Sequence, residues 1–314
     1  MKVLFMGTPD FAAVTLDKLI HSNHELIGAV TQPDKQRGRR QEVSFSPVKE
    51  LALAHSVPVY QPNKAKEPEF LEKVRELAPE VIVVAAFGQI LPKALLEIPP
   101  YGCINVHGSL LPRYRGAAPI QYSIIDGESE TGITIMYMDV GIDTGDMILQ
   151  SKLPIAKDET GGSLFDKMAQ LGADLLLEAL EQLEAGTAVR IPQNNDKATY
   201  VKMLSKEMGE LDFTQSAVRL ERLIRGLSPW PSAYTHLEGR TLKIWKAEVE
   251  DLEPKAAGPG QVVELRQDAL VVATGEGALV IRELQLEGKK RVTAEAFLRG
   301  YRLSIGTRLG REKE

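Results

Sequence analysis

The chain has 314 residues, of which 43% are hydrophobic, and a formal net charge of −5. Its length exceeds what one hydrophobic core usually supports, so we expect two domains. The single cysteine, Cys103, excludes an intramolecular disulfide and a multi-cysteine metal site and favours a reducing compartment. The first apolar run is too short for a signal peptide or a membrane span. These features predict a cytoplasmic protein that does not associate with a membrane.

Strands and helices alternate along the first half of the chain. Apolar runs predict strands at 2–6, 25–31, 57–60, 80–86, 103–107, 132–139 and 147–153. Helical periodicity predicts helices after residue 9 and at 47–55, 67–77, 120–125 and 160–186. Alternation of this kind is typical of a parallel α/β sheet.

The second half has a different pattern. A polar, aperiodic stretch at 187–199 indicates a linker. A predicted helix at 216–227 is followed by short strands at 241–247, 260–265, 269–273 and 278–286, which favour a small β-barrel or sandwich. The predicted organisation is therefore a first domain at 1–189, a linker at 190–206 and a second domain at 207–314.

One predicted strand carries two polar side chains on the same face. In the strand 103–107, the side-chain period of two puts Asn105 beside His107, and Ile104 beside Val106 on the opposite face. The carboxyl ends of parallel strands are where open α/β sheets place their binding sites. The pair is therefore either part of a functional site or the solvated face of an edge strand.

A second candidate is the loop at 139–146, where Gly141 and Gly145 hold Asp143 between two predicted strands. It is either an ordinary turn or a functional loop. The ligand spacing of a calcium loop and the zinc motif HExxH are both missing from the sequence, so we expect no metal.

Dinucleotide binding is not expected either. The first strand–helix turn, GTPDFA at 7–12, has one glycine where the dinucleotide-binding fingerprint has three. Pro9 also removes a backbone donor from that turn.

Several motifs, in the same order, resemble those of the folate-dependent formyltransferases. The longest is NVHGSLLPRYRGAAPIQ at 105–121, followed by DVGIDTGDM at 139–147. Shorter matches are MGTPDFA at 6–12, TQPD at 31–34, FGQILP at 87–92 and SPWP at 228–231. The agreement spans nearly the whole chain and is strongest with the members that formylate methionyl-tRNA. The resemblance implies an α/β fold in which a Rossmann-like, mostly parallel sheet domain is followed by a small OB-like β-barrel domain.

The resemblance also assigns roles to individual residues. The family's catalytic asparagine, histidine and aspartate fall on Asn105, His107 and Asp143. The co-substrate 10-formyltetrahydrofolate would lie against the segments 109–112 and 87–91. The expected folate-binding residues in these segments are Ser109, Leu110, Leu111, Pro112, Phe87, Gln89 and Ile90. For the two leucines, core packing is the alternative.

Formyl transfer explains why these residue types would be needed. When an amine attacks the formyl carbon, oxygen gains negative charge, which the Asn105 amide and a protonated His107 would stabilise. The departing folate nitrogen needs a proton, which His107 would carry. A carboxylate at Asp143 would favour the charged imidazole and orient its ring. A free α-amine has a pKa of about 7.7–8.0, so part of it is neutral near pH 7 without a strong base.

Three acceptors are consistent with this resemblance: methionyl-tRNA, an amino-sugar nucleotide and glycinamide ribonucleotide. Enzymes for the last resemble only the first domain. Amino-sugar enzymes tend to carry an arginine where this chain has Ala117. We therefore expect transfer to the α-amino group of initiator methionyl-tRNA, which gives N-formylmethionyl-tRNA for translation initiation. The alternatives are an amino-sugar formyltransferase, a formyl-folate hydrolase or dehydrogenase domain, and a non-catalytic RNA-binding protein with a degenerate transferase domain.

A basic cluster supports the tRNA acceptor. Lys35, Arg37, Arg39 and Arg40 follow the second predicted strand of an otherwise acidic protein, and phosphates are the natural partners of such a cluster. The resemblance implies that this loop enters the acceptor stem, with Arg39 at the position of the key arginine. Arg40 stands where a second glycine is usual. A solvated run of charges is the alternative.

The second domain carries a weaker cluster at Lys289, Lys290 and Arg291, which is either tRNA-binding or an exposed turn. The resemblance implies that this domain lies along the tRNA, and OB folds commonly bind nucleic acids. The expected partners are initiator methionyl-tRNA and the folate co-substrate, and the expected oligomeric state is a monomer.

Overall fold

The computed structural model describes residues 1–37, 42–252 and 257–311. The chain divides into two compact units. The first unit contains residues 1–119, 130–154 and 165–201, and the second contains residues 120–129, 155–164 and 202–314. The segment 190–201, which the sequence analysis placed in a linker, belongs to the first unit.

The first unit is built on a seven-stranded sheet. Its strands are β1 (Lys2–Gly7), β2 (Glu25–Val30), β5 (Val59–Tyr60), β6 (Val81–Ala85), β7 (Cys103–His107), β9 (Glu130–Tyr137) and β10 (Met147–Pro154). Their order is β10-β9-β7-β6-β1-β2-β5. In this order, the five neighbouring strands β7, β6, β1, β2 and β5 pair in parallel. The strand β9 pairs antiparallel with both β7 and β10. The prediction of a mostly parallel α/β sheet is confirmed.

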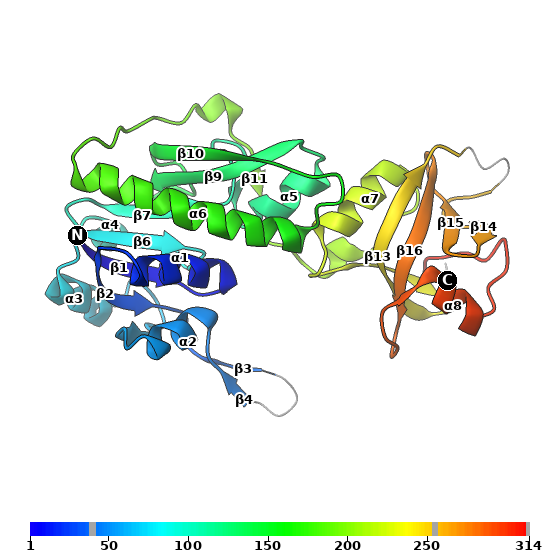
Figure 1. Ribbon diagram of the computed structural model, residues 1–314, viewed down its shortest axis with the longest axis horizontal. Helices are drawn as coiled ribbons and strands as arrows, with labels where there is room; N and C mark the ends of the chain where they lie inside the picture. The colour runs from blue at the N-terminus through cyan, green and yellow to red at the C-terminus, as the bar shows by residue number, and fades with distance from the viewer. Residues whose placement is uncertain (38–41, 253–256, 312–314) are drawn as a thin grey trace. The chain divides into compact units, whose positions relative to one another are not determined.

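Helices accompany this sheet (Figure 1). Their bounds are α1 (Asp10–Ile20), α2 (Pro47–Ala54), α3 (Pro68–Leu77), α4 (Lys93–Leu96) and α6 (Gly161–Glu184). The helix α5 (Pro119–Ile125) belongs, apart from its first residue, to the second unit. The rings of Phe11 on α1 and Phe165 on α6 meet edge to face at 5.5 Å. Gly172 lets α6 approach β7 closely, because a Cβ there would lie 2.8 Å from Val106 Cγ1. These two helices therefore pack beside each other, with α6 against the face of the sheet that carries Val106.

The opposite face of the sheet packs against α3 and α4. Its core cluster includes Phe70 and Leu95 from these helices together with Ile82 and Cys103 from the strands. Burial raises the pKa of the Cys103 thiol to about 12, so this cysteine is an inert core residue. On the same face of β7, the side chains that follow Cys103 are those of Asn105 and His107, at the carboxyl end of the strand.

Two small strand pairings were not predicted. One is an antiparallel hairpin of β3 (Lys35–Arg37) and β4 (Glu42–Ser44). The other is a parallel pairing of β8 (Arg115–Gly116) with β11 (Tyr200–Val201). The second pairing joins the end of the supposed linker to the segment after β7. A short 3₁₀ helix, η1 (Asn195–Lys197), precedes β11.

The second unit contains a separate antiparallel sheet. Its elements are η2 (Glu207–Gly209), α7 (Ala217–Gly226), β12 (Ala233–Leu237), β13 (Arg240–Glu250), β14 (Val262–Arg266), β15 (Ala269–Ala273), β16 (Ala278–Leu286), β17 (Val292–Thr293) and α8 (Ala294–Gly300). The strand order is β12-β13-β16-β15-β14, and β17 pairs with β16. Within the described ranges no ladder closes this order into a ring, so the predicted OB-like barrel is not confirmed.

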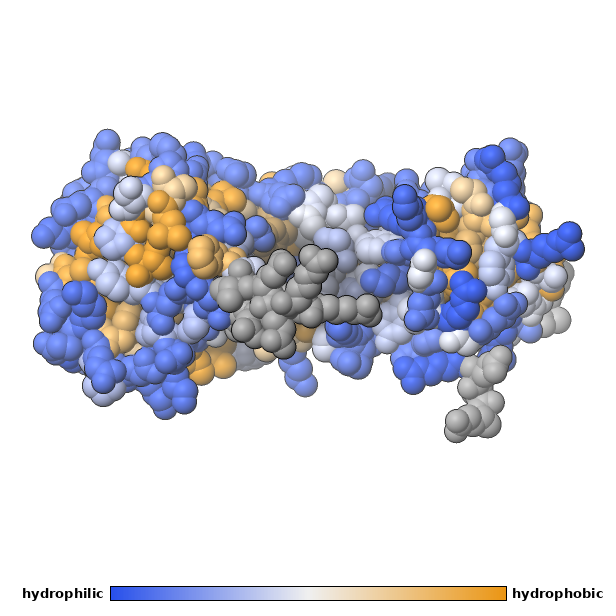
Figure 2. Space-filling view, turned by 90° about the horizontal axis from the view of Figure 1, so that it is seen from below, coloured by the Kyte–Doolittle hydropathy of each residue, from blue (hydrophilic) through white to orange (hydrophobic). Residues whose placement is uncertain are grey.

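Hydrophilic residues predominate on the face shown in Figure 2, and hydrophobic residues gather in a patch over part of the first unit. Among residues 1–37, 42–252 and 257–311, no helix combines the length and the apolar character that a bilayer crossing requires.

Replacing Ile104 with alanine tests how far β7 depends on its core. Ile104 is fully buried in this strand. Removing its side chain should lower the free energy of unfolding of the first unit by about 2–5 kcal/mol in urea titrations. Leu53→Ala is the control, because this leucine is 51% exposed on α2 and its loss should cost less than about 0.5 kcal/mol. Equal midpoints for both variants would contradict the burial of Ile104.

Candidate active site

β7 brings two of the predicted catalytic residues to the carboxyl edge of the parallel strands. Asn105 is in register with Val84 of β6 and Met136 of β9, and His107 is in register with Thr134 of β9. His107 is buried, whereas Asn105 is half-buried. In the part of the chain that the structure describes, the Asn105 amide makes no hydrogen bond. Its donors are therefore available to a ligand.

The two ring nitrogens of His107 have different partners. Nε2 lies 2.9 Å from the carbonyl oxygen of Tyr114. Because a carbonyl oxygen only accepts, Nε2 must carry the hydrogen of this bond. Nδ1 lies 3.7 Å from Oδ2 of Asp143. Nδ1 is therefore the nitrogen that can gain and lose a proton, and it faces a carboxylate.

Asp143 lies in the loop between β9 and β10. Its backbone adopts the left-handed region, with φ at +54°, which is uncommon for a residue other than glycine. Its Oδ2 accepts a 2.7 Å hydrogen bond from the backbone N–H of Gly116. Asp139 closes the same loop by accepting hydrogen bonds from Gly141 N at 2.9 Å and Thr144 Oγ1 at 2.6 Å. The loop thus presents the Asp143 carboxylate to His107.

The segment after β7 is tied to the neighbouring strands. Thr134 Oγ1 donates a 2.6 Å hydrogen bond to the carbonyl of Ser109 and accepts one from Leu111 N at 3.1 Å. Gln150 of β10 donates to the Leu111 carbonyl at 2.9 Å. Ser109 Oγ donates to the Arg113 carbonyl at 2.6 Å. These bonds fold the segment back so that the Tyr114 carbonyl reaches His107.

The predicted folate-binding residues lie in two loops that leave the neighbouring parallel strands β6 and β7 at the same edge. Within these loops, Phe87, Ser109 and Leu111 are buried. Gln89, Leu110 and Pro112 are half-buried, and Ile90 is 82% exposed. The buried members shape the loops, and the others provide surface.

Only part of the predicted basic cluster can be located. Lys35 and Arg37 are the end residues of β3, whereas Arg39 and Arg40 lie outside the described residues.

The base of this hairpin is anchored at Asp34, directly before β3. Its Oδ2 lies 2.5 Å from Lys49 Nζ, and its Oδ1 accepts a 2.9 Å hydrogen bond from Gln61 Nε2. Hydrogen bonds from Lys49 and then from Gln61 lower the pKa of Asp34, which therefore stays ionised and holds the start of the hairpin.

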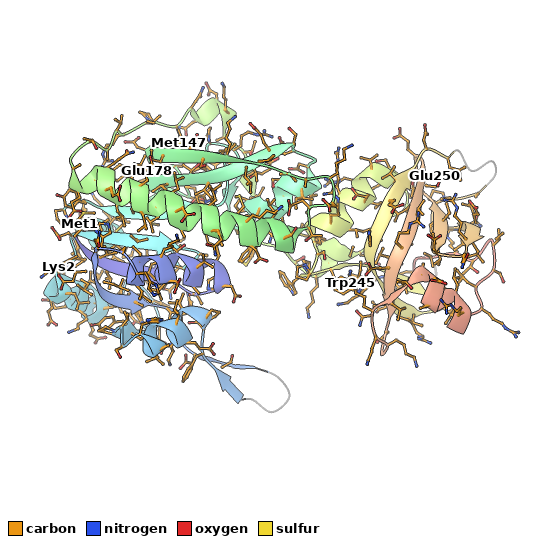
Figure 3. All side chains as sticks on the ribbon, viewed as in Figure 1. Met1, Lys2, Met147, Glu178, Trp245 and Glu250 are labelled. Atoms are coloured by element: carbon orange, nitrogen blue, oxygen red, sulfur yellow. The ribbon has the colours of Figure 1, made fainter. Side chains whose placement is uncertain are left out.

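The other predicted cations, Lys289 and Lys290, are exposed in the second unit and make no ion pair with described residues. Hydrogen bonds through Gln285 link Lys289 to Trp245 of β13, which Figure 3 labels. Trp245 Nε1 donates to Gln285 Oε1 at 3.2 Å, and Gln285 Nε2 donates to the Lys289 carbonyl at 2.9 Å. The Arg291 guanidinium lies 5.0 Å from the centre of the Trp245 ring. We call Trp245, Lys289, Lys290 and Arg291 the basic patch.

Sequence reasoning missed several contributors to the site. Gly116 and Tyr114 act through their backbone groups, which leave no signature in a pattern of side chains. Thr134 is identified only by its register opposite His107. No group of three or more His, Cys, Asp or Glu residues in the described ranges is placed to hold a metal ion.

Comparisons with known proteins agree with this geometry. A family model described as formyl transferase matches residues 1–180, and one described as formyl transferase, C-terminal domain, matches residues 203–302. The methionyl-tRNA formyltransferase of Lachnospira eligens is 51% identical over 314 residues, which cover 99% of this chain and 100% of that protein. The methionyl-tRNA formyltransferase of Agathobacter rectalis is 52% identical over 307 residues, which cover 98% of this chain and 99% of that protein.

Solved structures share the fold at lower identity. The sugar 3N-formyl transferase WlaRD, crystallised with dTDP and 5-N-formyl-THF, has a TM-score of 0.67 at 18% identity and covers 92% of this chain and 99% of its own. HypX from Aquifex aeolicus, in complex with tetrahydrofolic acid, has a TM-score of 0.61 at 18% identity, and the match covers 95% of this chain and 47% of that chain. The two family models match, and the methionyl-tRNA formyltransferases share about half of their residues with this chain over nearly its full length. The chain therefore belongs to the formyl transferase family, among the methionyl-tRNA formyltransferases.

Proposed function

We propose that this chain transfers the formyl group of 10-formyltetrahydrofolate to the α-amino group of initiator methionyl-tRNA. The product, N-formylmethionyl-tRNA, serves translation initiation, and we expect the reaction in the cytoplasm. The observation that carries the proposal is that Nδ1 of His107, on the strand that also presents Asn105, faces the Asp143 carboxylate, and that the Asn105 amide has no hydrogen-bond partner among the described residues. The chain is also about 50% identical to methionyl-tRNA formyltransferases over nearly their full length.

Exposed apolar side chains beside this site fit the co-substrate. Ile90 is 82% exposed, and Val140 and Ile142, which precede Asp143 in its loop, are 72% and 59% exposed. A folate ring system has flat apolar faces and hydrogen-bonding edges, so it would cover such side chains and use nearby backbone groups. No metal is needed for this arrangement.

The chemistry follows from the three side chains. When the neutral amine attacks the formyl carbon, a carbon–nitrogen bond forms and the formyl oxygen becomes negative, which the free Asn105 amide stabilises. The attacking nitrogen then loses a proton, and the folate nitrogen gains one as its bond to carbon breaks. His107 exchanges the proton at Nδ1, because its Nε2–H is engaged by Tyr114. The Asp143 carboxylate orients the ring and faces its charged form.

Two basic features support tRNA as the acceptor. The first is the run of cations that follows the anchored Asp34 in the sequence and includes Arg39. The second is the basic patch, in which an aromatic ring lies among cations, a combination that suits bases and phosphates. The OB-like topology of the second unit stays a prediction that would add a nucleic-acid-binding face. A monomer is the state we expect.

The choice of acceptor is tested with labelled 10-formyltetrahydrofolate and either methionyl-tRNA or a 4-amino-sugar nucleotide. We expect formylated methionyl-tRNA and only background label on the sugar. His107→Ala, once shown to be folded and to bind folate, should yield no product with either acceptor. Formylation of the sugar alone would refute the tRNA acceptor, and tRNA binding without any transfer would favour the non-catalytic alternative.

Asp143→Asn separates the charge of this residue from its shape. The amide oxygen can still accept the Gly116 N–H, but the negative charge opposite His107 is lost. We expect kcat to fall by about 10²-fold or more, with little change in KM for either substrate, in steady-state assays. Asp139→Asn is the control, because that carboxylate contacts only its own loop in the described structure. A change confined to KM would exclude the orienting role.

The basic hairpin is tested by the salt dependence of tRNA use. Arg39→Ala should lower kcat/KM for methionyl-tRNA, and further neutralisation should flatten the log–log salt slope of binding by about 0.7–0.9 for each lost phosphate contact. The residues to neutralise are Lys35, Arg37 and Arg40 in the hairpin and, in a separate variant, Lys289 and Lys290. Lys66→Ala, at an exposed lysine elsewhere, is the control. Unchanged kcat/KM at every salt concentration would leave the hairpin a solvated run of charges.

A further inference from the structure

Arg115 is a buried cation whose partners are neutral. The residue is 1% exposed in β8 and has no carboxylate partner among the described residues. Its guanidinium donates to Gln193 Oε1 at 3.1 and 2.8 Å, to Tyr200 OH at 2.9 Å and to Asn195 Oδ1 at 2.8 Å. Burial of a charge is costly unless hydrogen bonds compensate it. All four contacts come from the segment after α6, which the sequence analysis interpreted as a linker.

The amide of Gln193 also bonds the loop that carries Asp143. Its Nε2 donates to the Asp143 carbonyl at 2.8 Å and to the Gly145 carbonyl at 2.7 Å. A guanidinium only donates and carbonyls only accept, so the amide fits this place in one orientation. Its oxygen must face Arg115 and its NH₂ must face the loop. Arg115 therefore sets the direction in which Gln193 holds the loop.

This loop needs external support. Asp143 has a left-handed backbone, and such a conformation persists in a residue other than glycine only where its surroundings hold it. Gln193 bonds the carbonyl of Asp143 itself, and Gly116, which follows Arg115, bonds its carboxylate. β8 therefore reaches Asp143 twice, once through a backbone N–H and once through the Arg115–Gln193 pair.

The supporting segment is itself fixed at both ends. Met147, where β10 begins (Figure 3), exchanges backbone hydrogen bonds of 2.8 and 2.9 Å with Ile191. Thr199 Oγ1 accepts a 2.8 Å hydrogen bond from Tyr114 N, and the Tyr114 carbonyl is the acceptor for His107 Nε2. The segment 191–199 thus supports the backbone behind both His107 and Asp143.

We propose that Arg115 and Gln193 are positioning residues that hold the Asp143 carboxylate at His107, an inference that rests on the proposed formyl transfer. Arg115 orients the Gln193 amide, and the amide holds the two loop carbonyls. Neither residue exchanges a proton or contacts the reacting atoms. Their contribution is to the geometry of a catalytic pair, so their loss should lower kcat while leaving substrate binding unchanged.

The first test is Gln193→Met, which keeps the length of the side chain but removes its donors and acceptor. With wild-type transfer activity as the baseline, we expect kcat to fall about 10- to 10²-fold, with KM for both substrates within about twofold. Asn194→Ala is the matched control: this neighbouring exposed amide caps η1 and contacts neither Arg115 nor the loop in the described structure. It should leave kcat unchanged.

Gln193→Glu keeps the proposal testable if the methionine variant does not fold. A carboxylate retains the acceptor for Arg115, now as an ion pair, but loses both donors to the loop. We expect a folded protein whose kcat is reduced as in Gln193→Met. Wild-type kcat in Gln193→Glu would overturn the proposal, because the bonds to the loop carbonyls would then be dispensable.

A double-mutant cycle distinguishes positioning from a general loss of structure. If Gln193 acts through Asp143, then Gln193→Met should change kcat by less than about threefold in the Asp143→Asn background. Equal fold losses in both backgrounds would show that Gln193 acts elsewhere and would overturn the proposal. A wild-type protein without transfer activity would instead refute the proposed function.

Discussion

β7 pairs in parallel with β6 on one side and antiparallel with β9 on the other, so no residue of this strand can move to the other face without breaking two ladders. Cys103 faces the core beneath α3 and α4, and the same row of side chains continues to Asn105 and His107. The antiparallel β9 places Thr134 opposite His107, and that hydroxyl folds back the segment after β7. The register of one central strand thus determines which of the predicted catalytic groups can meet.

The charges near this strand are held largely by neutral groups. His107 donates to a backbone carbonyl, Asp143 accepts from a backbone N–H, and Arg115 donates to amide and hydroxyl oxygens. Backbone groups and packed amides cannot be displaced as easily as long charged side chains, and they require little reorganisation during a reaction. His107 Nδ1 lies 3.7 Å from the Asp143 carboxylate, which is the arrangement that the proposed proton exchange requires.

The fold alone does not select the acceptor. WlaRD, a sugar 3N-formyl transferase, shares this fold at 18% identity, whereas the relatives of about 50% identity are methionyl-tRNA formyltransferases. Differences of this kind arise in loops and added units around a common sheet. In this chain the segment 35–40 and the basic patch are the two places where the proposed function puts contacts with tRNA, and both are rich in Lys and Arg in a protein of net charge −5.

The sequence by itself determined the strands of the first sheet and the shared face of Asn105 and His107, because alternation and burial are local properties of a short run of residues. The glycines around Asp143 also made its loop a candidate, but only the resemblance to known formyltransferases joined Asp143 to Asn105 and His107, because no spacing connects that loop with β7. Only the tertiary structure decided how Asp143 is held and which nitrogen of His107 is free. The polar segment at 190–206 shows the reason most clearly. Its composition is typical of a linker, yet Gln193 bonds a buried arginine 78 positions earlier in the chain. Periodicity reports whether a side chain is buried, whereas its hydrogen-bond partner depends on which distant segments the fold brings together.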